Sequence, residues 1–325
     1  MKAIFPGVML AAVIALAALA ITDHYGGPVM LLALLIGMAF NFLAGDARFA
    51  AGIDFVARHV LRLGVGLLGL RISWEQVVAL GWSPLLLVVA AVALTLIVGV
   101  VCARLLGLSR GFGVLTGGAV GVCGASAAMA IAAVMPRHAG LQRDTAFTVV
   151  GVTVLSTVAM LLYPLLVAFL GYSDARAGVF LGATIHDVAQ VVGAGYIVSD
   201  PAGDLATYTK LMRVAMLLPL VMLVAVAVGR REGQGSVVAT ALPWFLLLFA
   251  GLVVVNSLDL VPAALHSGLV SVAQGCLVTA IAALGVKTSL GEMAKVGPRA
   301  ALLIAVETVV LALLVITALL WLPLP

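Results

Sequence analysis

Residues 111–134 read GFGVLTGGAVGVCGASAAMAIAAV, an apolar segment with six glycines among its first fourteen residues. Each glycine inside a helix costs up to about 1 kcal/mol relative to alanine. The segment is therefore expected either to unwind or to pack very closely on a neighbour, for which Gly117 and Gly121 have the GxxxG spacing. Both outcomes can hold together. Unwound backbone persists at membrane depth only where protein or a water-filled cavity surrounds it.

The composition around this segment is that of a membrane protein. Of the 325 residues, 64% are hydrophobic and 9% are charged, whereas soluble domains carry about 25% charged residues. Soluble enzymes, disordered proteins and nucleic-acid-binding proteins are thereby excluded. Apolar segments lie at 5–21, 28–44, 56–72, 84–106, 112–135, 145–170, 177–198, 208–229, 242–258, 267–286 and 300–322. Because a spanning helix needs about 20 apolar residues, they predict an all-α polytopic protein with about 11 transmembrane helices in one domain, residues 1–325.

Basic residues predict how the chain lies in the bilayer. With eleven crossings, twelve Lys and Arg residues fall on the side of the N-terminus and five on the other. The positive-inside rule then predicts a cytoplasmic N-terminus and an outside C-terminus in a bacterial inner membrane. The first segment, with Lys2 and the small residues Ala18 and Ala20, also has features of a cleaved signal; the sequence leaves this open.

The seventh segment contains GATIHDVAQVVGAG at 182–195. An ionised group here costs at least about 2.5 kcal/mol and usually has a function, so His186, Asp187 and Gln190 are candidate coupling residues for a proton or a cation. The alternative is a structural pair, in which Asp187 meets a buried cation and His186 meets a carbonyl. The glycines around these residues favour a second irregular helix.

A break in the fifth segment would expose backbone N–H groups at the start of a half-helix, where the helix dipole suits an anion. The candidate substrate-binding residues are Gly121, Cys123, Gly124, Ala125 and Ser126, with Gln274 and Gly275 in the tenth segment as an inverted counterpart.

Three further ionisable residues are candidates of lower specificity. Glu307, in the last segment, is a candidate proton-coupling residue, or a buried partner of Arg62. Lys210 and Arg213 either extend to the interface or supply charge for an anion.

Some motifs are missing. The chain has no GxxxxGK[ST] phosphate loop and no HExxH motif, and Cys102, Cys123 and Cys276 lack metal-knuckle spacing. We expect no disulfide, no metal, no cofactor and no enzymatic activity.

Two internal similarities predict repeats of opposite orientation, which are typical of secondary transporters. Residues 67–81 match 283–297 at an offset of 216, and residues 130–133 match 280–283. The alternative is chance similarity between Ala- and Leu-rich helices. The two offsets imply different repeat units, and the sequence does not choose between them.

The chain resembles the YeiH-type family of proposed sulfate exporters. Four parts of the sequence carry the resemblance: the fifth segment, the seventh segment, KLMRVAMLLPLV at 210–221 and LGVKTSLGEMAKVGPRAALLI at 284–304. The resemblance implies kinship with the bile-acid, arsenite and riboflavin transporter group. It implies two inverted five-helix repeats, at 28–172 and 173–325, after an extra N-terminal helix at 1–27. The fifth and tenth segments would then be a pair of crossing broken helices, which supports the second offset.

These expectations combine into one hypothesis. The chain is expected to export a small anion, such as sulfate or a sulfonate, by alternating access, with coupling to protons or sodium. A passive anion channel is the first alternative, and an intramembrane enzyme or a structural membrane subunit is the second. The substrate, the coupling ion and the oligomeric state, including a homodimer, stay open.

Overall fold

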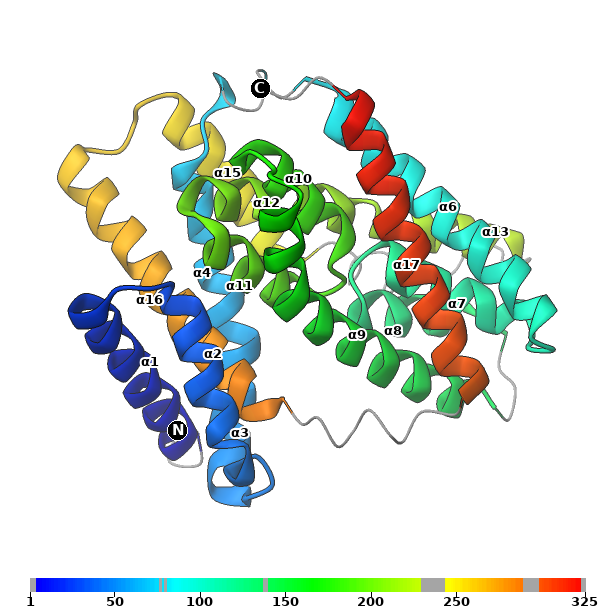
Figure 1. The fold of residues 1–325 in the computed structure, drawn as a ribbon, viewed down its shortest axis with the longest axis horizontal. Coiled ribbons are helices and arrows are strands. Elements are labelled where there is room, and N and C mark those ends of the chain that lie inside the picture. Colours follow the sequence, from blue (N-terminus) through cyan, green and yellow to red (C-terminus); the bar gives the residue numbers. More distant parts are fainter. Residues whose placement is uncertain are drawn as a thin grey trace.

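The computed structural model describes residues 4–75, 78, 81–136, 140–228, 243–288 and 298–322. In these residues the secondary structure is helical, and no strand occurs. Six helical stretches are long and apolar enough to cross a membrane, and shorter apolar helices accompany them. The prediction of an all-α polytopic membrane protein is confirmed (Figure 1).

The helices follow the predicted apolar segments closely. The long or single helices are α1 (Phe5–Tyr25), α2 (Val29–Ala39), α6 (Ser83–Leu105), α9 (Leu141–Phe169), α15 (Trp244–Ser257), α16 (Ala263–Lys287) and α17 (Pro298–Trp321). The short helix η1 (Asn41–Leu43) follows α2. The third segment is one continuous stretch made of α3 (Ala47–Phe55), the π-helical turn η2 (Val56–Val60), α4 (Leu61–Leu67) and the 3-10 helix η3 (Leu68–Arg71). The eighth is α12 (Asp200–Ala215) followed by α13 (Leu217–Ala227).

Contacts between helix ends define two faces of the molecule. At the face where α1 begins, called the N-terminal face here, Gly7 packs against the backbone of Gly52 in α3. At the end of α16, Lys287 pairs with Asp54. At the opposite face, the Asn256 side chain at the end of α15 donates to the Ile72 carbonyl over 3.1 Å. Each long helix therefore connects one face to the other.

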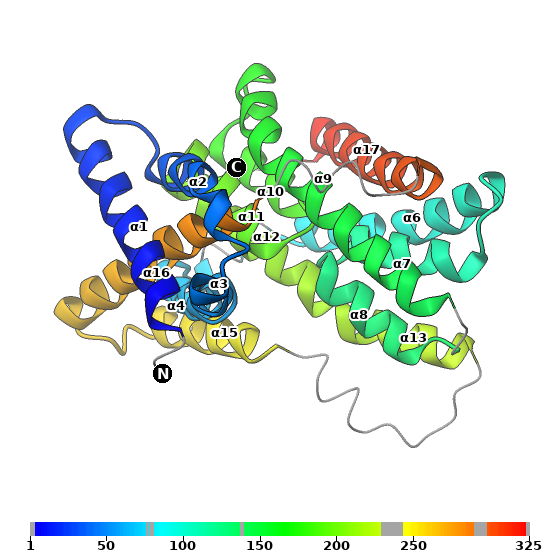
Figure 2. The same ribbon diagram turned by 90° about the horizontal axis from the view of Figure 1, so that it is seen from below.

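The fifth segment breaks as predicted, and it also turns back. Helix α7 (Arg110–Gly121) ends before Val122, and α8 (Ala125–Val134) begins after Gly124. A Cβ on Gly111 would lie 2.9 Å from the Met135 side chain, so the two ends of the segment are adjacent. The segment is a re-entrant hairpin, called hairpin 1, which enters from the N-terminal face and returns to it. Figure 2 shows its two arms beside each other.

The seventh segment is a second re-entrant hairpin, which enters from the opposite face. Its arms are α10 (Asp174–Thr184) and α11 (Val188–Val198), joined by Ile185, His186 and Asp187. The Ser199 hydroxyl donates to the Asp174 carboxylate over 2.6 Å, which holds the two outer ends together. This segment is called hairpin 2. The irregular helix expected here is confirmed.

These hairpins correct the predicted topology. In the described residues the fifth and seventh segments turn back, whereas a simple crossing was expected for each; the number of transmembrane helices stays a prediction. Helix α16 runs uninterrupted from Ala263 to Lys287, so the fifth and tenth segments are not a pair of crossing broken helices. The broken segments are the fifth and the seventh.

The offset of 216 residues fits the helices better than the alternative. The continuous helical stretch from α3 to η3 covers residues 47–71. Adding 216 to these numbers gives 263–287, which are the bounds of α16. The same shift moves α6 from 83–105 to 299–321, which lies inside α17. In both pairs the two members run in opposite directions between the faces. The ranges 28–172 and 173–325 given above for the two repeats stay a prediction.

Candidate functional site

The tips of the two hairpins meet in the interior. A Cβ on Gly124, at the tip of hairpin 1, would lie 3.6 Å from the His186 side chain of hairpin 2. Gly124 itself has φ +64°, a conformation that side chains disfavour. A glycine therefore suits this position by its backbone angle.

Two fully buried cations of α12 hold the tips together. Lys210 Nζ donates to the carbonyls of Val122 and Ile185, over 2.7 Å and 2.9 Å, and so bonds to one residue of each hairpin. Arg213 donates to Gly121 and Val120 in hairpin 1 and to two carbonyls of hairpin 2, those of Gly182 and Ile185. Neither side chain has any exposed surface. Lys210 and Arg213 thus do not extend to the interface.

The chemistry of helix ends explains this arrangement. The last carbonyls of a helix lack partners within the helix and carry partial negative charge. Both α7 and α10 end inside the molecule, where water is scarce, so their final carbonyls need donors. Lys210 and Arg213 supply these donors and offset the negative end of each helix dipole. Among the described residues, neither cation forms an ion pair with a carboxylate.

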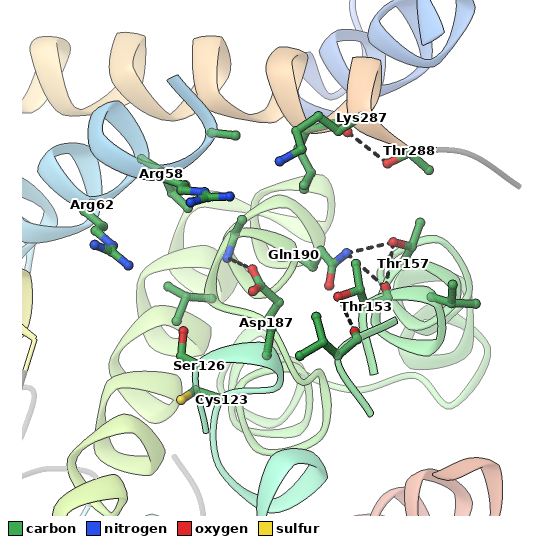
Figure 3. Close-up of a pocket in the computed structure, with 18 of the residues that line it drawn as sticks. Arg58, Arg62, Cys123, Ser126, Thr153, Thr157, Asp187, Gln190, Lys287 and Thr288 are labelled. Carbon is green, nitrogen blue, oxygen red and sulfur yellow. Dashed lines mark hydrogen bonds between the residues drawn. The ribbon is translucent and has the colours of Figure 1, made fainter. Parts of the chain in front are cut away.

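A cavity of about 590 Å³ lies beside the tips. It reaches from Lys287 and Thr288, at the N-terminal face, to Cys123 and Ser126 of hairpin 1 and to the start of α11. Figure 3 shows these side chains around one space. Three of the predicted substrate-binding residues line it, namely Cys123, Ala125 and Ser126. Gly121 and Gly124 belong to the adjacent tip but are not among the lining residues.

Two helix N-termini point at this cavity. Ala125 and Ser126 begin α8, whose N-terminus has no side-chain cap because Gly124 precedes it. Val188 and Ala189 begin α11, and there the Asp187 carboxylate accepts from Ala189 N over 2.8 Å. The break in the fifth segment thus places a helix N-terminus without a side-chain cap beside the cavity; that it binds an anion stays a prediction.

Arg58 and Arg62 also line the cavity, from η2 and α4. They lie four residues apart on one side of the third segment, across the space from Asp187 (Figure 3). The guanidinium of Arg62 lies 5.9 Å from the centre of the Phe245 ring. From the sequence, Arg62 is predicted only as a partner for Glu307. The signal that points to this role of Arg58 and Arg62 is two arginines at helical spacing inside an apolar segment.

Asp187 and Gln190 reach the cavity as one polar wall. Gln190 donates its amide to the Thr157 hydroxyl over 2.7 Å, while its oxygen is buried and has no partner. The backbone N–H of Asp187 donates to Ser156 on α9 over 3.0 Å. Asp187 caps a helix and faces the cavity, and none of the described cations pairs with it.

The other two candidate coupling residues lie elsewhere. His186 has no exposed surface, and its Nε2 lies 2.9 Å from the Thr308 hydroxyl on α17. Glu307 is also buried and accepts from the Thr116 hydroxyl over 2.7 Å. Neither residue is among those that line the cavity. The structure therefore pairs Glu307 with Thr116 rather than with Arg62.

Gln274 and Gly275 lie apart from the residues that line the cavity and from His186 and Glu307. They lie within the continuous helix α16, and Gly275 has open space where a Cβ would be. Neither is among the residues that line the cavity. The second broken segment, which was expected in the tenth segment, is the seventh.

Together, the fold and the site define a polytopic membrane protein in which two re-entrant hairpins meet beside an interior cavity. Comparison with known proteins agrees with this class. The family model described as conserved hypothetical protein 698 matches residues 6–304. A UPF0324 membrane protein named TauZ from Paracoccus denitrificans is 51% identical over 318 residues, covering 97% of this chain and 94% of the relative. A UPF0324 membrane protein from Chlorobaculum tepidum is 48% identical, covering 98% and 89%. The chain belongs to the UPF0324 membrane protein family. No solved structure matches it.

Proposed function

We propose that this protein is a secondary transporter that exports a small anion, such as sulfate or a sulfonate, by alternating access. One observation carries the proposal: the uncapped N-terminus of α8 and the arginines Arg58 and Arg62 surround one cavity. Helix N-termini and guanidinium groups are the donors that proteins use for oxyanions. In the proposed complex, Ser126 and the first N–H groups of α8 contact the anion from one side and Arg62 from the other.

The shape of the molecule supports alternating access. The cavity reaches the N-terminal face. On the opposite side, Gly178 and Gly182 of α10 and Gly195 of α11 pack closely against α12. An ion pair of 3.0 Å between Arg71 of η3 and Asp204 of α12 lies on that side. A site at the meeting point of broken helices, accessible from one side at a time, is typical of secondary transporters.

The distribution of basic residues supports an orientation in the membrane and, with it, a direction of transport. With two re-entrant hairpins, the N-terminal face of the described residues carries Arg48, Arg104, Arg110, Arg143, Lys287 and Arg299, and the opposite face carries Arg71 and Arg176. The positive-inside rule then orients the N-terminal face towards the cytoplasm, in the inner membrane of a bacterium, with the C-terminus outside. The cavity would load its anion from the cytoplasm, as export requires.

Counterflow in proteoliposomes tests this function. Purified protein is reconstituted in vesicles preloaded with sulfate or a small sulfonate, and uptake of the same labelled anion is measured. A charge-assisted hydrogen bond contributes about 1.5–3 kcal/mol, so Arg62→Gln should reduce uptake at low substrate by about ten- to a hundredfold. Arg48→Gln is the matched control, because Arg48 lies on the surface and pairs with Asp46; it should transport normally.

The alternatives give different results. A passive channel would conduct without saturation and without counterflow. An enzyme or structural subunit would show no anion binding, whereas a ligand of the folded state raises thermal stability by mass action. Equal uptake by Arg62→Gln and Arg48→Gln would contradict the proposed site.

A further inference from the structure

A buried carboxyl group lies apart from the cavity, in the middle of α17. Glu307 has no exposed surface, its Oε1 accepts from Thr116, and its Oε2 has no hydrogen-bond partner. The nearest backbone includes that of Gly99 in α6, where a Cβ would lie 2.7 Å from Oε1. The absence of a side chain at Gly99 makes room for the carboxyl group.

Opposite charge is missing around Glu307 in the described residues. Helices α6, α7, α9 and α10 pack against α17. Their charged residues are Arg104, Arg110, Arg143, Asp144, Asp174 and Arg176, all within a turn or so of a helix end, and their other titratable side chains are Cys102 and Tyr163. No salt bridge of the described residues includes Glu307. His186 of hairpin 2 bonds to the hydroxyl of Thr308, the next residue of α17.

Burial and missing charge together decide the state of this carboxyl group. Removing an ionised carboxylate from water costs several kcal/mol unless a cation or several donors compensate it. Glu307 has a single donor, the Thr116 hydroxyl, and a second oxygen without a partner. A neutral carboxylic acid fits these surroundings, and an ion does not.

Both hairpins contact this part of α17. Glu307 bonds to Thr116 in the α7 arm of hairpin 1, and Thr308 bonds to His186 at the tip of hairpin 2. We propose that Glu307 is a proton-binding site in the membrane interior, and that loss of its proton separates α17 from the hairpins. The released carboxylate would need water, which it can reach only if these helices move apart. The coupling ion would then be a proton; this last step rests on the proposed function, whereas the proton site does not.

Infrared spectroscopy of the reconstituted protein tests the proton site directly. A protonated carboxyl has a carbonyl stretch that an ionised one lacks. The spectrum of the wild type minus that of Glu307→Gln at neutral pH should show this band, with a small shift in D2O. Asp187→Asn is the control, because Asp187 faces the cavity, and this variant should retain the Glu307 band. Absence of the band from the wild-type minus Glu307→Gln spectrum would overturn the proposal.

A second variant keeps the test valid if Glu307→Gln does not fold. Thr116→Val preserves the volume at residue 116 and removes the hydroxyl that donates to Oε1. The band of Glu307 should then move to higher frequency, because its carbonyl loses a hydrogen bond. A band that does not move would show that it belongs to another residue, and would overturn the assignment.

Transport measurements test the coupling separately. For a group that binds one proton, the ratio of protonated to ionised form changes about tenfold per unit of pH. The net export rate of the wild type should therefore change by up to about tenfold per unit of a pH gradient across the membrane. Glu307→Gln should still exchange labelled anion but respond less than about twofold per unit. A wild-type rate that ignores the gradient would overturn the coupling. Absence of any anion transport would refute the proposed function, while the infrared band would still decide the proton site.

Discussion

Replacing Lys210 with methionine tests whether the buried cations hold the hairpin tips together. Methionine keeps the length of the side chain and removes both N–H donors. The Ile185 carbonyl keeps its bond from Arg213 over 3.1 Å, whereas the Val122 carbonyl loses its bond from Lys210. One buried carbonyl is therefore left without this donor.

The expected loss of folding free energy follows from the number of buried carbonyls that lose their donor. An unsatisfied buried acceptor costs about 1–3 kcal/mol, and removing a buried charge offsets part of it. Lys210→Met should thus destabilise the folded protein by about 1–3 kcal/mol. Arg213→Met removes four bonds, including those to Gly121, Val120 and Gly182. By the same estimate its cost of about 3–9 kcal/mol is comparable with the whole stability of a folded domain.

The assay is unfolding in detergent micelles by heat or denaturant. The matched control is Lys287→Met, because Lys287 pairs with Asp54 where both side chains are partly exposed, and exposed pairs contribute about 0–1 kcal/mol. Lys287→Met should be the most stable of the three variants, Lys210→Met less stable, and Arg213→Met the least stable. If Lys210→Met unfolds together with the control, the two hydrogen bonds of Lys210 do not hold the tips.

Three further changes test other parts of the structure. Gly124→Ala forces a side chain to adopt φ +64° and should cost about 1–3 kcal/mol by the same assay; unchanged stability would contradict the tip geometry. Asp204→Asn weakens the pair with Arg71, and the double variant with Arg71→Leu should cost less than the sum of the two single changes; additive costs would contradict a direct contact. Hydrogen bonds from Arg48 lower the pKa of the Asp46 carboxyl below its usual 3.8, so the stability from this cap is present above pH 3.8 and is lost as pH falls through the lower folded value. An NMR titration should show this lowered midpoint in the wild type and a rise of the midpoint towards 3.8 in Arg48→Gln, which keeps the backbone hydrogen bond of residue 48 but loses the guanidinium; a midpoint that does not change would contradict the side-chain contact.

Local sequence was enough to predict where the helices break. Six glycines up to and including Gly124 weaken the helix whatever surrounds it, and His186 next to Asp187 is costly inside an apolar helix. The path of the chain after each break could not be predicted in this way. Hairpin 1 turns back because Ile131 packs on Gly118 and because α12 supplies donors for the tip. Such contacts join residues that are distant in sequence, and no local pattern contains them.

The tenth segment shows the opposite error. Its similarity to the fifth segment lies in short runs of alanine, which also suit a straight, closely packed helix. In the structure, α16 packs Gly285 against the backbone of α2 at Gly37. Glycine near the end of a helix served close packing here, whereas glycine in the middle of the fifth segment served a break. Helix α16 stays continuous through Gly275 in its middle, so a single central glycine does not break a helix, whereas the fifth segment has six glycines among fourteen residues.

The helix ends at the tips would allow the proposed site to be both stable and suited to an anion. Each tip contains the negative end of one helix and the positive end of the next. Lys210 and Arg213 bind the negative ends, of α7 and α10, and are themselves out of reach of the cavity. The positive ends of α8 and α11 are left towards the cavity, where Asp187 caps only α11. The field at the base of the cavity is therefore positive on the side of Ser126, so a bound anion would be stabilised by charges that it does not touch.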